Sequence, residues 1–248
     1  MVKIEDNKKE DSASVKVTAD KDFGLDLEKM TEAGLCFGHR VSQIHPKMKP
    51  YICRTKDTVH IIDLKKTAKE FEDALYFIKK IISENKTLLL VGTKIQVKDL
   101  VKEFSEGCDL LYVNERWLGG TFTNFKTIKK RIEYFKDLEK KKETGELRKY
   151  TKRERIKIDK ELKNLEVKFG GIKNIEKLPD AIFVLDIKRD NLAVKEARKK
   201  GIKIIAITDT NVDPTLADYP IPANDDAISS VKYILEKVAE VIKKSKNK

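Results

Sequence analysis

Acidic side chains stand at the ends of several apolar runs that the sequence predicts to be strands. Asp63, Asp186 and Asp209 each follow such a run. Ligands in parallel α/β sheets bind beyond these strand ends, so a nucleotide-dependent enzyme is the first chemistry to test. Neither G-x-G-x-x-G nor G-x-x-x-x-G-K-[ST] occurs, and residues 92–94 (Gly-Thr-Lys) supply too little backbone to wrap phosphates. We therefore expect no catalytic residue, with a nucleotide-binding α/β enzyme kept as an alternative.

Two further groups of side chains have the chemistry of metal ligands. One group offers two thiolates and two imidazoles, which zinc would accept, but its spacing matches no usual paired-ligand motif. Its members are Cys36, His39, His45 and Cys53. In the other group, Asp186 and Asp209 could share a divalent ion, although such carboxylates more often cap helices or shape turns. We assign no metal ligand and expect no cofactor.

A third set of residues suits RNA. Residues 38–40 (Gly-His-Arg) and 46–51 lie in a proline-bounded, non-helical stretch whose cations can contact phosphates. Trp117, the only tryptophan, stands beside Arg116 and shortly before two glycines. It could stack on an unpaired base, or it could be an aromatic side chain wedged beneath the helices that follow. The sequence leaves both roles open.

The net charge of the chain is concentrated in two segments. The whole chain has 53 Lys and Arg against 41 Asp and Glu, a net charge of +12. Residues 126–163 hold 16 basic against 8 acidic side chains, and residues 232–248 hold 6 against 2. This basicity indicates a polyanionic partner. Because no long apolar helix face accompanies it, we expect nucleic acid rather than a membrane.

Hydrophobic periodicity predicts the elements that carry these residues. Apolar side chains recur every three or four positions within 125–135 and again within 158–169, which predicts two antiparallel helices closing on a coiled-coil seam. The rest alternates apolar strands with helices, which predicts an α/β fold with a parallel sheet covered on both faces. The expected strands are residues 59–63, 87–91, 110–113, 181–186, 203–207 and 218–221.

These elements divide the chain into four parts. We predict an acidic, disordered N-terminal extension over 1–28, and a discontinuous α/β domain over 29–124 and 170–231. The basic helical hairpin occupies 125–169, and 232–248 form the end of a C-terminal helix and a basic tail. Three scattered cysteines are too few for a disulfide framework, and we therefore expect a reducing, cytoplasmic location.

Nine sequence blocks resemble one protein family. In chain order they read EAGLCFGHR, HPKMKPYI, VHIIDLKKT, LLLVGTK, YVNERWLGGTFTNFKTIKK, FGGIKNIEKLPDAIFVLD, KEARKKGI, AITDTNVDP and IPANDDAISSV. Their order is that of bacterial-type small ribosomal subunit protein two, and the likeness runs over residues 32–237.

The resemblance implies a flavodoxin-like α/β domain with a coiled-coil hairpin and no catalysis. It implies a structural role on the ribosome, with contacts to small-subunit ribosomal RNA and to neighbouring proteins that include small-subunit protein one. A protein-docking module without RNA contact is a further alternative. The residues that the resemblance places toward RNA are Gly38, His39, Arg40, Lys47, Lys49, Lys94, Arg116, Trp117, Lys126, Lys129 and Lys130.

Overall fold

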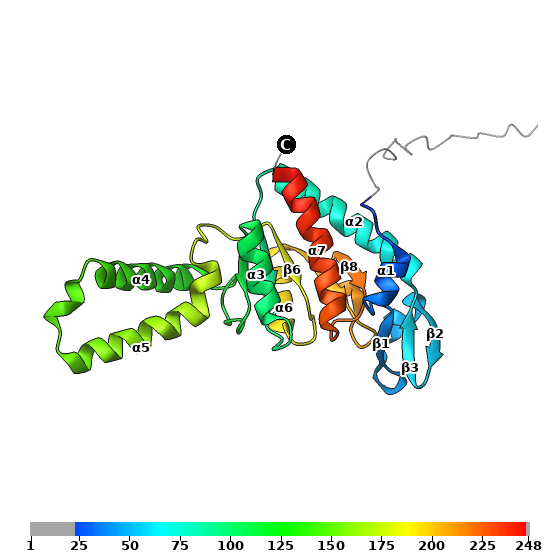
Figure 1. Cartoon of the computed structure of the whole chain (residues 1–248), viewed down its shortest axis with the longest axis horizontal. Helices are drawn as coiled ribbons and strands as arrows, with labels where there is room; N and C mark the ends of the chain where they lie inside the picture. Colours follow the sequence, from blue (N-terminus) through cyan, green and yellow to red (C-terminus); the bar gives the residue numbers. More distant parts are fainter. Residues whose placement is uncertain (1–22, 247–248) are drawn as a thin grey trace, which may run out of the picture.

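The structure, a computed structural model, describes residues 23–246 and contains a five-stranded parallel sheet (Figure 1). Its strand order is β5-β4-β6-β7-β8. Counted along the chain this is 2-1-3-4-5, the order of flavodoxin-like sheets, so the predicted α/β class is confirmed. The strands are β4 (Leu88–Val91), β5 (Leu111–Val113), β6 (Ala181–Val184), β7 (Lys203–Thr208) and β8 (Tyr219–Pro222).

Both faces of this sheet are buried, because its strands are continuous apolar runs whose side chains alternate in direction. Leu88 and Leu90 point to one face, which is covered by α2, α3 and α7. Leu89 and Val91 point to the other face, which is covered by α6 and the base of the hairpin. The bounds of these helices are Leu64–Ser83 (α2), Lys98–Cys108 (α3), Asn191–Lys200 (α6) and Ile228–Lys246 (α7).

The first predicted strand lies outside the parallel sheet, which corrects our expectation. β3 (Val59–Ile62) is the middle strand of a separate antiparallel sheet, between β1 (Phe37–Arg40) and β2 (Ile52–Lys56). Its side chains are alternately half-buried and buried, so only one face packs against the body. A central parallel strand would be buried on both faces. The pair Asp57 and Thr58, both at positive φ, forms the two-residue turn that makes the antiparallel pairing with β2 possible.

The predicted hairpin is present between β5 and β6 as α4 (Phe125–Glu143) and α5 (Lys152–Phe169). It projects away from the sheet, at the opposite end of the molecule from the small antiparallel sheet (Figure 1). Gly145, at φ 74°, turns the chain, and Thr151 with Glu154 forms the predicted capping box of α5. The coiled-coil character of the hairpin stays a prediction.

Shorter elements connect these parts. α1 (Leu27–Glu32) begins within the residues assigned to the extension, of which 1–22 lie outside the described part of the chain. Residues 46–51, predicted to be non-helical, form a 3₁₀ helix. Among the helices of residues 23–246, none combines the length and apolar character of a membrane span. The 3₁₀ helices are η1 (Val41–Gln43), η2 (Pro46–Tyr51), η3 (Glu146–Lys149), η4 (Gly170–Ile172) and η5 (Pro214–Leu216).

Candidate nucleic-acid interface

The hairpin is held together by a narrow apolar seam. Ile132, Phe135 and Leu138 of α4 and Leu162 and Phe169 of α5 are all buried. They belong to the same cluster as the sheet face beneath α6, so the base of the hairpin is continuous with the core of the body. The seam uses few positions of each helix, which leaves most of the hairpin surface to charged side chains.

That surface is strongly basic. Residues 125–169 contain 17 Lys and Arg against 9 Asp and Glu. Lys126, Lys129 and Lys130 are exposed on the first turns of α4, and Arg116 is exposed in the loop before them. Their long side chains can lay apolar stems on the surface and extend the cationic ends to a polyanion. The structure therefore brings four of the predicted RNA-facing cations to the base of the hairpin.

Trp117 belongs to the interior of this base. Only 6% of its surface is exposed, and its ring and that of Phe122 form a T-shaped pair with a centroid distance of 4.8 Å and an interplanar angle of 72°. Both rings lie in the cluster that joins the sheet to the hairpin. A buried ring offers no face to a nucleotide, so the structure favours the alternative of a wedged aromatic, and contact between Trp117 and RNA stays a prediction that its burial does not support.

A buried carboxylate fixes the loop that leads into the hairpin. Glu196 of α6, 5% exposed, accepts hydrogen bonds from the backbone N–H groups of Gly120, Phe122 and Thr123 at 2.7, 2.9 and 3.1 Å. Burial raises the pKa of Glu196, but these hydrogen bonds outweigh burial and hold it below the ordinary value. Glu196 was not among the predicted site residues, and its one signal in the sequence is an acidic residue among the buried Ala193, Val194 and Ala197.

Lys94 is also buried, at 8% exposure, beyond the end of β4. Its Nζ lies 3.1 Å from Asp225 Oδ1 and 3.7 Å from Asp186 Oδ2, and it also pairs with Asp226. Burial opposes its charge, but these carboxylates dominate and raise the pKa of Lys94. The ammonium is thus occupied by carboxylates from distant parts of the chain. These ion pairs do not support an RNA contact of Lys94, which stays a prediction.

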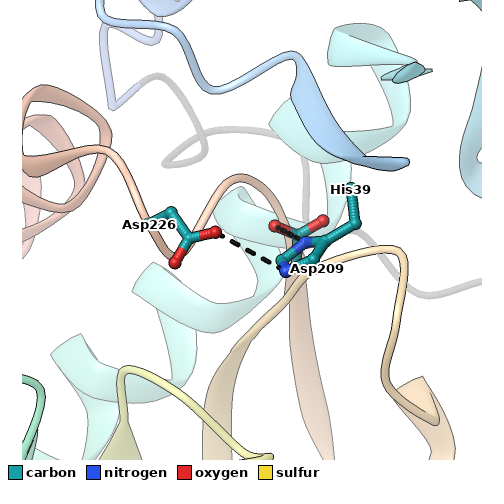
Figure 2. Close-up of side chains that lie close together, drawn as sticks. All are labelled: His39, Asp209 and Asp226. Atoms are coloured by element: carbon teal, nitrogen blue, oxygen red, sulfur yellow. Dashed lines mark ion pairs between the residues drawn. The ribbon is translucent and has the colours of Figure 1, made fainter. Parts of the chain in front are cut away.

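Three side chains beside Lys94 have the geometry of metal ligands. His39 Nδ1 lies 2.9 Å from Asp209 Oδ2, and His39 Nε2 lies 3.5 Å from Asp226 Oδ2 (Figure 2). One ligand atom from each residue falls within 4.8 Å of the others, the only such group found in residues 23–246. The hydrogen bond to Asp209 raises the pKa of His39. An imidazole and two carboxylates suit a divalent transition metal, yet here they also serve each other and Lys94 as ion-pair partners.

The two cysteines and two histidines considered as zinc ligands from the sequence do not come together in the structure. Cys36 is buried and Cys53 is exposed on an edge strand, and only His39 of that set joins the group of potential ligands. Asp186 and Asp209 serve different duties: Asp186 accepts from the N–H of Arg189, whereas Asp209 pairs with His39.

The remaining predicted RNA-facing residues lie near β1 and η2, far from the hairpin (Figure 1). Arg40 and Lys49 are exposed, and the Lys47 ammonium is paired with Asp213 at 2.8 Å. Gly38 packs so closely against Thr210 that an added Cβ would lie 2.5 Å from its Cγ2. The predicted set therefore divides into two exposed basic regions and an interior that contains Lys94 and Trp117.

Comparison with known proteins agrees with the nine sequence blocks. The family model described as Ribosomal protein S2 matches residues 30–245. The small ribosomal subunit protein uS2 of Dictyoglomus thermophilum is 48% identical over 221 residues, which cover 89% of this chain and 90% of that relative. By the extent of both matches, the chain belongs to the ribosomal protein S2 family.

Proposed function

We propose that this protein anchors itself in the small ribosomal subunit through ribosomal RNA bound at the basic base of the hairpin. Membership of the ribosomal protein S2 family makes it a structural constituent of the small subunit and not an enzyme. The same membership makes small-subunit ribosomal RNA and other ribosomal proteins its partners, and the ribosome its location. The assignment of RNA contacts to particular residues is the proposal.

The observation that carries the proposal is the exposed cluster of Arg116, Lys126, Lys129 and Lys130 at the point where the hairpin leaves the body. Cations that contact phosphates fix the orientation of a protein on RNA without reading its sequence. The Glu196 hydrogen bonds and the buried Trp117 hold the backbone beneath these cations. Specificity would then come from the match between a rigid basic surface and the shape of folded RNA.

We propose a second, smaller RNA contact at the other end of the molecule. Arg40 and Lys49 are exposed there, and Lys47 would exchange its ion pair with Asp213 for a phosphate. Exposed ion pairs are worth about 0–1 kcal/mol, so this exchange costs little. His39 and Gly38 would support the contact as backbone and packing elements.

Neighbouring ribosomal proteins would bind surfaces that are not purely basic. On α5, Ile156 and Val167 are 60% and 58% exposed, and this apolar exposure supports a protein contact on the hairpin. From the family resemblance we further propose small-subunit protein one as a neighbour, and a cytoplasmic location.

Reconstitution tests this function. Small subunits assembled from purified ribosomal RNA and the remaining small-subunit proteins should take up the wild-type chain. The triple variant Lys126→Glu, Lys129→Glu, Lys130→Glu should be taken up poorly. As a matched control, Lys65, Lys69 and Lys80 are exposed on α2, and their reversal should leave uptake unchanged. Equal uptake of the hairpin variant and the wild type would reject the proposed anchor.

A further inference from the structure

The small antiparallel sheet presents an outer face with a distinctive set of side chains. Residues directly opposite each other in antiparallel strands point to the same side of the sheet. Arg40 of β1 and Lys56 of β2 both pair with Val59 of β3, so a cation stands on each side of a half-buried valine. Both cations are exposed.

The next row of the same face adds an aromatic ring. Phe37 of β1 and Arg54 of β2 both pair with Ile61 of β3. A register shift between Phe37 and Arg40 sets three steps of β1 against two of β3, which keeps both side chains on the face of Ile61. Phe37 is 49% exposed, and Arg54 is exposed. The outer sheet face thus consists of Phe37, Arg40, Arg54, Lys56, Val59 and Ile61.

The opposite face of this sheet is fixed to the body. His60 and Ile62 of β3 are buried, and the ring of His60 shares a hydrogen bond with the Thr55 hydroxyl. The N–H of His39 donates to Thr210 Oγ1 at 2.9 Å, which ties β1 to the end of β7. The outer sheet face is therefore a platform backed by the body of the protein.

We infer that this outer sheet face binds unpaired RNA, with a base stacked on Phe37 and neighbouring phosphates held by Arg40, Arg54 and Lys56. Every base has a π-face, so an exposed aromatic ring on a sheet accepts unpaired bases with little sequence preference. The two arginines can pair with phosphate in a bidentate manner or stack on a second base. Among its six strand residues there is no carboxylate to repel a phosphate.

The same chemistry argues for RNA over a protein partner. Protein interfaces place large apolar side chains at their centre and cations at the rim. Here Val59 and Ile61 at the centre are half-buried among three cations, and Phe37 is the one large apolar side chain of the face that is exposed. This platform lies apart from the hairpin anchor. It shares Arg40 with the proposed second RNA contact and rests on that part of the proposed function, which it extends to unpaired RNA stacked on the Phe37 ring.

The test uses the full-length protein and a fluorescently labelled ten-nucleotide oligouridylate, with binding followed by fluorescence anisotropy. Two variants separate the aromatic ring from simple apolar bulk. Phe37→Leu keeps an apolar side chain and should weaken binding roughly fivefold or more, the lower range for loss of one stacked base. Phe37→Tyr keeps the ring and should bind within about twofold of wild type. Tyr76→Leu, at an exposed aromatic of α2, should have no effect.

Further variants distinguish RNA from a protein partner, and the outer sheet face from the hairpin. Arg54→Glu should weaken oligouridylate binding and make it less dependent on salt, because one phosphate contact is lost. Adding Phe37→Leu to the hairpin triple variant should weaken binding by the same factor as in wild type, which separates this platform from the proposed anchor. Equal affinities of wild type and Phe37→Leu would overturn the inference. Loss of a neighbouring protein from Phe37→Leu subunits, with oligouridylate affinity unchanged, would reassign the face to protein docking.

Discussion

The carboxylate of Glu196 accepts a 2.7 Å hydrogen bond from the backbone N–H of Gly120. These two residues are 76 positions apart, on α6 and on the loop that enters the hairpin. Together with the amides of Phe122 and Thr123, the contact turns a glycine-containing loop into a fixed joint. Glu196 therefore helps to set the direction of the hairpin relative to the sheet, together with the apolar cluster at the hairpin base.

Replacing this acid should loosen the joint. In Glu196→Gln the side chain has a single acceptor oxygen, and its NH₂ group opposes backbone donors. We expect a loss of about 1–3 kcal/mol in the free energy of unfolding, measured by urea denaturation. Glu133→Gln, an exposed position of α4, serves as the control and should change stability by less than about 0.5 kcal/mol.

The pH dependence gives a second measure of the same contact. The folded-state pKa of Glu196 lies below the ordinary value of 4.5, so its stabilising contribution is present above that pH and is lost as the pH falls. The stability gap between wild type and Glu196→Gln should therefore shrink in acid. A gap that stays constant down to the acid transition would show that the charge is not what holds the loop.

Asp225 should make the stability of the protein depend on pH in the opposite direction from Glu196. Burial and the carboxylates of Asp186 and Asp209 raise its pKa to about 7 from 3.8, although Lys94 opposes the shift. An acid with a raised folded-state pKa binds its proton on folding, so its contribution to stability falls as the pH rises from about 4 to about 7. Asp225→Asn should remove that component.

This prediction is checked by urea unfolding of wild type and Asp225→Asn at several pH values between about 4 and about 8, a range that brackets the raised pKa. His39 pairs with Asp209 and Asp226, and the charge of Asp225 contributes to its raised pKa, so both proteins are compared in a His39→Gln background. The difference between the two curves therefore isolates Asp225. Parallel curves over the whole range would contradict the raised pKa.

Trp117 provides a spectroscopic test of the hairpin base. Because it is the only tryptophan and is buried, its fluorescence should be blue-shifted, poorly quenched by iodide and unchanged when ribosomal RNA is added. Trp117→Ala should cost about 3–5 kcal/mol of stability, and Trp117→Phe, which keeps a ring against Phe122, should cost less. Strong quenching by RNA would place the ring at the interface instead.

Local patterns predicted the elements of this fold well. The helical repeat over α2 and the capping box of Thr151 depend on near neighbours in sequence, and both are observed as expected. The strand β3 was predicted in the parallel sheet because its sequence is a continuous apolar run. In the structure only one of its faces is buried, the one formed by His60 and Ile62. Only the pairing with β1 and β2 shows that it belongs to a separate sheet.

Long-range partners account for what could not be predicted in the candidate site. Lys94 reads in sequence as a free cation at a strand end, but it meets Asp225 from 131 positions away. Whether the Lys94 ammonium is paired depends on which strands lie side by side. The residues next to Lys94 in the sequence do not contain that information. For Lys126, Lys129 and Lys130 the local prediction of exposure was confirmed, because an amphipathic helix places such residues opposite its own seam.

The proposed function requires ribosomal RNA to bind at the basic base of the hairpin. It is tested most directly by the salt dependence of binding to a folded fragment of small-subunit ribosomal RNA, measured for wild type and the Lys126→Glu, Lys129→Glu, Lys130→Glu variant. Each lost phosphate contact should reduce the log–log salt slope by about 0.7–0.9, so the variant should bind more weakly and with a slope shallower by about 2–3. Identical affinity and slope for the two proteins would show that these three lysines do not hold the RNA.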